Sequence, residues 1–271
     1  MAVAEVWTLD QGRAQLKFNE WNKEKNNVVI LDTETTGLYD SEICEVSVID
    51  LDGNVIFDSL VKPKNPIPRE VKAIHGISDE MVADKPSWPE TWESLYPLIK
   101  DKIVLIYNSE FDVRLMAESF YPYYPENAEE IKQVEGLKTA CVMKTYAALV
   151  GSGKWLKLTQ AAGRQIAHRS LDNCKATLEV IRKSYNPDFT ETTFQRLENW
   201  HELESISKRI RYLSYRIKEL SEEQVGLVKR QKELQVRLFG FEFEDEKEVA
   251  ASYHDVDNDQ RFDISDDDLP F

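Results

Sequence analysis

Two carboxylates, Asp32 and Glu34, stand two positions apart in the segment Asp-Thr-Glu-Thr-Thr-Gly that begins at residue 32. The segment ends an apolar run, so it lies at the end of a predicted strand, where side chains at i and i+2 point to the same face. Carboxylates held side by side repel and raise each other's pKa unless a cation lies between them. The pair therefore favours a divalent metal site. The alternative is a solvated strand end followed by a turn at Thr36-Gly37.

Two further segments place acid–base side chains at the starts of predicted helices. Asp112 ends the segment Asn-Ser-Glu-Phe-Asp, which follows a predicted strand and opens a helix near the same strand ends. The alternative is an ordinary helix start, with Ser109 as N-cap and Asp112 in the first turn. His168 precedes another predicted helix, where it could take a proton from a metal-bound water, although a lone histidine is more often structural.

These side chains must be positioned by strands that come first and by helices that follow. Apolar runs predict strands over residues 27–33, 43–50, 54–61 and 103–107, with Asp52-Gly53 as a hairpin turn. Helices are expected over about 5–25, 111–120, 138–150, 158–165 and 171–185. Strands first, and then strand and helix in alternation, predict an α/β domain with a mixed sheet flanked by helices.

The composition is that of a globular protein of a reducing compartment. Of its 271 residues, 42% are hydrophobic and 10% aromatic, which is enough for a core. The three cysteines are scattered and odd in number, which argues against a disulfide framework and favours the cytoplasm. The sequence has no export signal at its start and no uninterrupted apolar run of about 18 residues, so we expect neither export nor a membrane span.

Three motifs, which start at Asp32, Asn108 and His168, resemble in order and spacing those of the DEDD-type 3′→5′ exonucleases. The similarity is to the DEDDh subgroup, which includes the proofreading epsilon subunit of bacterial DNA polymerase, and it covers about residues 28 to 185. It implies a ribonuclease H-like fold and a mechanism with two Mg²⁺ or Mn²⁺ ions. Asp32 would bridge both ions, Glu34 would hold the nucleophile-side ion, Asp112 would support the other, and His168 would be the general base.

The resemblance also implies which residues contact the 3′-terminal nucleotide. They belong to the first motif, the second motif and a loop after the third strand: Thr35, Thr36, Gly37, Leu38, Asn108, Phe111 and His75.

The sequence departs from the family pattern five residues after the histidine, where Asn173 replaces the last carboxylate and fourth predicted metal ligand. An amide offers one neutral oxygen and no charge, so the nucleophile-side ion should bind more weakly. Asp172 is adjacent, but one residue along a helix turns a side chain by about 100°, so it could substitute only if the helix began elsewhere. Three explanations stay open: an engineered substitution that traps substrate, a natural variant of weak activity, and a binding-only descendant.

Residues 203–238 carry apolar residues at alternating steps of three and four, a heptad seam in which Gln224 and Gln231 occupy the same row. The seam predicts coiled-coil self-association, and so a homo-oligomer, or a long helical hairpin. The alternative is a helix packed on its own domain. The phase is constant across a capping-box pattern at Ser221, which favours one continuous helix.

The net charge of −15 is concentrated in residues 240–271, where twelve acidic residues face two basic ones, so the rest carries only −5. A metal-dependent nuclease tolerates that charge because bound cations reverse the local field. The acidic stretch is poor in aliphatic residues and predicts a disordered tail. Its end resembles the tip of bacterial single-stranded DNA-binding proteins, which docks Pro and Phe into an apolar pocket of a partner. The implied partner-binding residues are Asp266, Asp267, Asp268, Leu269, Pro270 and Phe271.

The chain is thus expected to hold a helical extension (1–27), an exonuclease domain (28–190), a long helix or coiled coil (191–239) and an acidic tail (240–271). The expected function is removal of nucleotides from the 3′ ends of single-stranded DNA, attenuated or trapped by Asn173. Replication and repair proteins that bind such tips are the expected protein partners. Alternatives are a catalytically silent nucleic-acid-binding adaptor, an exoribonuclease, and a scaffold that works through its coiled coil and tail.

Overall fold

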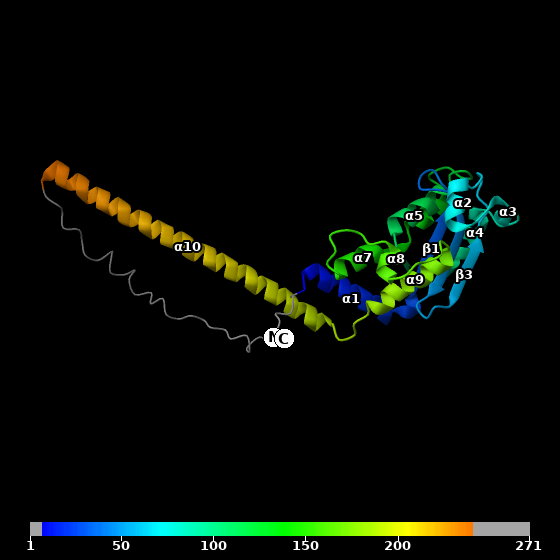
Figure 1. Ribbon diagram of the computed structural model, residues 1–271, viewed down its shortest axis with the longest axis horizontal. Helices are drawn as coiled ribbons and strands as arrows, with labels where there is room; N and C mark the ends of the chain where they lie inside the picture. The colour runs from blue at the N-terminus through cyan, green and yellow to red at the C-terminus, as the bar shows by residue number, and fades with distance from the viewer. Residues whose placement is uncertain (1–6, 241–271) are drawn as a thin grey trace. The chain divides into compact units, whose positions relative to one another are not determined.

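The structure is a computed structural model that describes residues 7–240 (Figure 1). Its contacts divide the chain into two units, one ending at Glu202 and the other starting at Leu203, which are described separately. The first unit contains a five-stranded sheet of order β3-β2-β1-β4-β5. The strands are β1 (Val28–Thr35), β2 (Ile43–Asp50), β3 (Val55–Leu60), β4 (Ile103–Ile106) and β5 (Lys138–Cys141). The first three form the antiparallel meander predicted from the sequence, and β4 and β5 continue the sheet in parallel.

Both faces of the sheet are covered, as the nearly continuous apolar run of β1 requires. Val29 and Leu31 belong to one buried cluster, whereas Val28 and Ile30 belong to another on the opposite face. This two-sided burial confirms the predicted mixed sheet flanked by helices.

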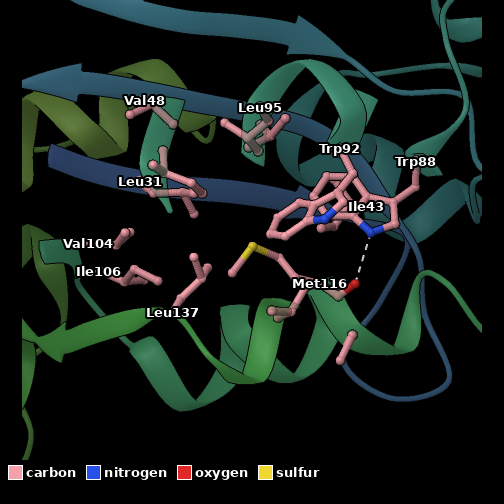
Figure 2. Close-up of a cluster of buried hydrophobic side chains, with 14 of the residues drawn as sticks. Leu31, Ile43, Val48, Trp88, Trp92, Leu95, Val104, Ile106, Met116 and Leu137 are labelled. Atoms are coloured by element: carbon pink, nitrogen blue, oxygen red, sulfur yellow. Dashed lines mark hydrogen bonds between the residues drawn. The ribbon is translucent and has the colours of Figure 1, made fainter. Parts of the chain in front are cut away.

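Helices α4 (Trp88–Ile99), α5 (Ser109–Glu118) and α6 (Glu129–Glu135) supply the first cluster. Figure 2 shows Trp88 and Trp92 packed beside Ile43 and Met116, with the Trp88 indole donating a hydrogen bond to the Met116 carbonyl oxygen at 2.9 Å. The second cluster is supplied by α1 (Leu9–Lys23), α7 (Val142–Leu149), α8 (Leu158–Ala162) and α9 (Ser170–Lys183). Short elements complete the unit: η1 (Lys25–Asn27), α2 (Arg69–His75) and α3 (Asp79–Val82).

The expected helix over residues 138–150 is wrong in its first turn. Residues Lys138–Cys141 form β5, which pairs in parallel with β4 from Ile103↔Lys138 to Ile106↔Cys141, and α7 begins only at Val142. Four residues at the edge of a sheet show too little periodicity to be recognised, and their strand conformation depends on the ladder with β4.

The N-terminal helix α1 confirms the helix expected over about residues 5–25 and is part of the first unit. A capping box between Thr8 and Gln11 starts it, and Phe18 and Trp21 lie in the second core cluster. On its buried face, Asn19 donates to the carbonyl oxygens of Asn186 and Phe189 at 2.6 and 2.7 Å. The helix thus fastens the segment that leaves α9.

Helix α10 (Glu191–Phe239) runs without interruption for 49 residues, and its part from Leu203 onward forms the second unit. This confirms the single helix expected from the constant heptad phase and excludes the hairpin alternative for residues 191–239. The seam is open to solvent: Leu203, Ile217 and Leu227 are 57%, 64% and 64% exposed. Between residues 7 and 240 no helix combines the length and apolar character needed to cross a bilayer. The acidic tail and its tip lie outside the described residues.

Candidate active site

A hollow of about 450 Å³ opens where β1, the β4–α5 junction and the start of α9 meet. Its walls hold all five residues predicted to be catalytic, namely Asp32, Glu34, Asp112, His168 and Asn173. Because β1 and β4 run in parallel, their carboxyl ends reach the same sheet edge, and Asp112 lies in the first turn of the helix that follows β4. The topology thus brings together side chains that lie up to 141 positions apart in the sequence.

Hydrogen bonds arrange the acidic side chains around Asn173. Its amide nitrogen Nδ2 donates to Asp32 Oδ2 at 3.0 Å and to Glu34 Oε1 at 3.1 Å. On the other side, Asp112 Oδ1 accepts from the Thr33 backbone N–H at 3.2 Å and from Thr33 Oγ1 at 2.8 Å. Since α9 begins at Ser170, residue 173 faces the hollow and Asp172 is not part of its lining. The adjacent carboxylate therefore does not substitute for the missing one.

The electrostatics of the hollow are those of an unbalanced acidic cluster. Burial raises the pKa of Asp32 well above its usual value, and the charges of Asp112 and Glu34 raise it further. Burial, together with the charges of Glu45 and Asp112, raises the pKa of Glu34 from 4.5 to about 7. Burial likewise raises the pKa of Asp112 to about 7, against its hydrogen bonds from Thr33. A positive charge bound in the hollow would therefore favour full ionisation of these groups at neutral pH.

The donor set suits hard divalent cations, which prefer carboxylate and amide oxygens. In the described part of the chain, however, no three His, Cys, Asp or Glu side chains are arranged as a ready-made metal site. The oxygens of Asp32, Glu34 and Asp112 that would bind a cation instead accept hydrogen bonds from Asn173 and Thr33. Rotation of the Asn173 amide would replace its nitrogen with its oxygen, which is an acceptor.

The ion pair between Glu45 and Arg169 was not predicted from the sequence. Glu45 lies opposite Glu34 in the β1–β2 ladder and is 3% exposed. It accepts hydrogen bonds from Arg169 Nε at 3.0 Å and from the Ser170 backbone N–H at 2.9 Å, and Arg169 Nη2 completes a two-pronged pair. This pair fixes the start of α9, and with it the positions of His168 and Asn173. The only signal in the sequence was an acidic residue between the apolar residues Cys44 and Val46 of a predicted strand.

Of the residues predicted to contact the terminal nucleotide, Asn108 and Phe111 line the hollow. The first-motif residues Thr35 and Thr36 instead form hydrogen bonds with backbone groups of the turn that follows β1. Thr35 Oγ1 donates to the Gly37 carbonyl at 2.7 Å, and Thr36 Oγ1 accepts from the Glu42 N–H at 2.9 Å.

Two other predicted contact residues lie apart from this lining. Leu38 is 65% exposed, and its carbonyl oxygen accepts from Arg114 at 2.8 Å. His75 is buried, and its Nδ1 accepts from the Ile77 N–H at 3.0 Å while its Nε2 lies 3.8 Å from Cys44 Sγ. These contacts give His75 a structural role, and its contact with a nucleotide stays a prediction.

Comparison with known proteins defines the class of this site. The family model "RNase_T: Exonuclease" matches residues 29–181. The uncharacterized exonuclease CP81 of Escherichia phage 186 is 38% identical over 166 residues, which cover 56% of this chain and 85% of that protein. The epsilon subunit of DNA polymerase III from Pasteurella multocida is 36% identical over 104 residues, 34% of this chain and 41% of that subunit. The structure of Exonuclease X in complex with 5′ overhanging duplex DNA covers 63% of the chain at 26% identity, with a TM-score of 0.44.

The site therefore belongs to an exonuclease domain, and the chain is a member of the exonuclease family. This confirms the exonuclease assignment that the three motifs indicated. The chain spans less than half the length of the epsilon subunits that it matches.

Proposed function

We propose that the protein is a metal-dependent 3′→5′ exonuclease of the DEDDh type that acts on single-stranded 3′ ends of DNA and is attenuated by Asn173. One observation carries the proposal: Asp32, Glu34, Asp112 and His168, which come from three distant segments, line a single hollow. Acidic residues gathered in a cleft, with raised pKa values, are typical of a catalytic site.

Asp32, Glu34 and Asp112, together with the amide oxygen of Asn173, would hold two Mg²⁺ or Mn²⁺ ions. Such ions, when bound, lower the pKa of water and stabilise charge on the leaving oxygen. The carboxylates would then be released from the hydrogen bonds of Asn173 and Thr33 that now hold them.

The chain's own side chains would supply orientation and proton transfer. His168 lies at the exposed rim of the hollow, where it would accept a proton from the attacking water. Phe111 offers an aromatic face to the terminal base, and Asn108 offers a hydrogen-bonding amide beside it. The remaining predicted nucleotide contacts, which include Leu38 and His75, belong to this proposal as well.

Asn173 favours a second candidate, the catalytically silent adaptor. Its amide nitrogen donates to one oxygen each of Asp32 and Glu34, so these two oxygens have a hydrogen-bond donor without a cation. Such a protein would bind a 3′ end without cleaving it.

Polarity and substrate can be tested together on single strands labelled at the 3′ or the 5′ end, as DNA and as RNA, with Mn²⁺ or EDTA. The exonuclease releases the 3′ label as a mononucleotide, and shortens the 5′-labelled strand progressively, in Mn²⁺ only. Asp32→Asn is the inactive control. Asn173→Asp restores the fourth carboxylate, so it should reveal nuclease activity that is too low to detect in the unsubstituted chain. Binding without degradation by both the natural protein and Asn173→Asp would establish the adaptor, and preference for RNA would establish an exoribonuclease.

The long helix and the tail extend the proposal to partners. The exposed apolar seam of α10 is suited to pairing with a second copy of the chain, with Gln224 and Gln231 setting the register. The tip from Asp266 to Phe271, outside the described residues, would recruit replication or repair proteins in the cytoplasm. Deletion of Phe271 should abolish binding to such proteins, and unchanged binding would remove this part of the proposal.

A further inference from the structure

A second hollow, of about 690 Å³, lies between α1, α7 and the loop that follows α7. We call it the α1–α7 groove. Helices α1 and α7 lie side by side (Figure 1), and Gln11 of α1 donates to the Leu149 carbonyl oxygen of α7 at 3.3 Å. The groove belongs to the first unit and is separate from the residues that line the candidate active site.

The α1–α7 groove is lined mainly by basic charged residues, although the protein has a net charge of −15. Its lining includes four basic side chains and a single acidic one, Asp10. The basic residues are Arg13, Lys17, Lys144 and Lys154. The first three form exposed ion pairs, with Asp10, Glu20 and Glu110 respectively. Exposed pairs contribute little stability, so these cations can exchange their partners for phosphates. No carboxylate in the described residues lies within ion-pair distance of Lys154.

An exposed indole lies beside these charges. Trp155 is 68% exposed, whereas Trp21, Trp88 and Trp92 are buried in the core. Its loop is anchored, because Tyr107 Oη donates to the Leu156 carbonyl oxygen at 2.7 Å and Ser152 Oγ donates to the Lys154 carbonyl oxygen at 2.6 Å. An exposed tryptophan on an anchored loop, next to basic side chains, is suited to stack on a nucleobase whose phosphates the cations bind.

The α1–α7 groove adjoins the candidate active site at two points. Lys154 and Trp155 line the groove, and the next residues but one, Lys157 and Leu158, line the active-site hollow. At the second point, Lys144 of the groove pairs with Glu110, which stands between Asn108 and Phe111 of the active site. A strand whose last nucleotide lies in the active site can therefore continue directly into the groove.

We propose that the α1–α7 groove binds the single strand upstream of its 3′-terminal nucleotide, with Trp155 as the stacking platform and Lys154 as a phosphate contact. The proposal rests on the proposed function, because it requires that a 3′ end occupies the active site. It assigns the N-terminal helix, which contributes Arg13 and Lys17, to substrate binding.

The test measures binding rather than turnover. Fluorescence anisotropy of 3-nucleotide and 16-nucleotide DNA strands, in EDTA, would compare the full chain with Lys154→Ala/Trp155→Ala. We expect the double variant to bind the 16-mer at least about tenfold more weakly, with a shallower salt dependence, and to bind the 3-mer as the natural chain does. The matched control is Lys100→Ala/Tyr121→Ala, which removes an exposed lysine and an exposed tyrosine. These two residues follow α4 and α5, which cover the sheet face opposite to α1 and α7.

The outcomes separate this proposal from the proposed function. Loss of 16-mer affinity in the groove variant alone supports the groove, even if no variant degrades DNA. The groove proposal would be overturned if the groove variant and the unsubstituted chain bound the 16-mer with equal affinity, even if the enzyme is active. It would also be overturned if the groove variant lost affinity equally for the 3-mer and the 16-mer. Thermal melting would check that the variants are folded. Trp155→Phe retains an aromatic ring of smaller size, so it should bind the 16-mer more tightly than Trp155→Ala.

Discussion

The amide nitrogen of Asn173 lies 3.0 Å from Asp32 Oδ2, so a neutral donor contacts a buried carboxylate whose pKa is raised by burial and by its acidic neighbours. An aspartate at position 173 could not donate this hydrogen bond while ionised, and it would add a further negative charge to the hollow. Asn173 therefore stabilises the metal-free state and weakens the metal-bound state.

Replacement of Asn173 by Asp should lower the thermal stability of the metal-free protein at pH 8. The change removes two hydrogen bonds and adds repulsion, so a loss of at least about 1–3 kcal/mol is expected, the cost of leaving a buried polar group without a partner. Thermal melting in EDTA would measure it, and Asp172→Asn is the matched control because Asp172 does not line the hollow. A melting temperature for Asn173→Asp at or above that of the natural chain would contradict the account.

The metal-free protein should lose stability as the pH rises from about 4.5 to above 7. Glu34 and Asp112 have pKa values of about 7 in the folded state, above their unfolded values, so their protonated forms favour folding and this contribution disappears as they ionise. For Glu34 alone the loss is at most about 3 kcal/mol. Denaturant titrations at pH 5.5 and pH 8 would show it, and Glu34→Gln should flatten the difference.

Divalent cations should reverse this loss. Because ions bind the ionised carboxylates, Mn²⁺ should raise the melting temperature more at pH 8 than at pH 5.5. Asp32→Asn should abolish most of the shift, and an equal shift in that variant would place the bound ion elsewhere.

Arg169 acts as a positioning residue for the start of α9. Arg169→Ala leaves the buried Glu45 without its cation. Because the Arg169 side chain is 41% exposed and solvent screens the pair, the loss of stability should be smaller than the roughly 3–5 kcal/mol of a fully buried pair. A better-tolerated variant is Glu45→Gln/Arg169→Gln, which removes both charges. In the Asn173→Asp background it should lower kcat and leave KM for a short strand nearly unchanged, because it displaces His168 without touching the nucleotide. An unchanged kcat would show that the pair is only structural.

The seam of α10 should set the oligomeric state. Ile210→Asp/Ile217→Asp places charges in the apolar row and should convert an oligomer into a monomer in light scattering. Tyr215→Asp, on the same helix but off the seam, is the control. If the natural chain is a monomer at high concentration, self-association through this helix is wrong.

The sequence was sufficient for those features that depend on local spacing. Asp32 and Glu34 share a face because they are two residues apart on a strand, and the constant heptad phase of residues 203–238 favoured one helix. The features that were missed depend on contacts distant in the sequence. The four residues of β5 become a strand only through pairing with β4, and Glu45 meets Arg169 across 124 positions. The orientation of the Asn173 amide likewise depends on carboxylates that only the fold brings to it.

The most direct measurement is a Mn²⁺ titration that counts bound ions by electron paramagnetic resonance, in the natural chain, in Asn173→Asp and in Asp32→Ala/Glu34→Ala. The account predicts weak binding by the natural chain, binding of two ions at least about tenfold tighter by Asn173→Asp, and loss of this binding in the double alanine variant. Mn²⁺ binding that is the same in all three proteins would contradict a metal centre formed by these carboxylates.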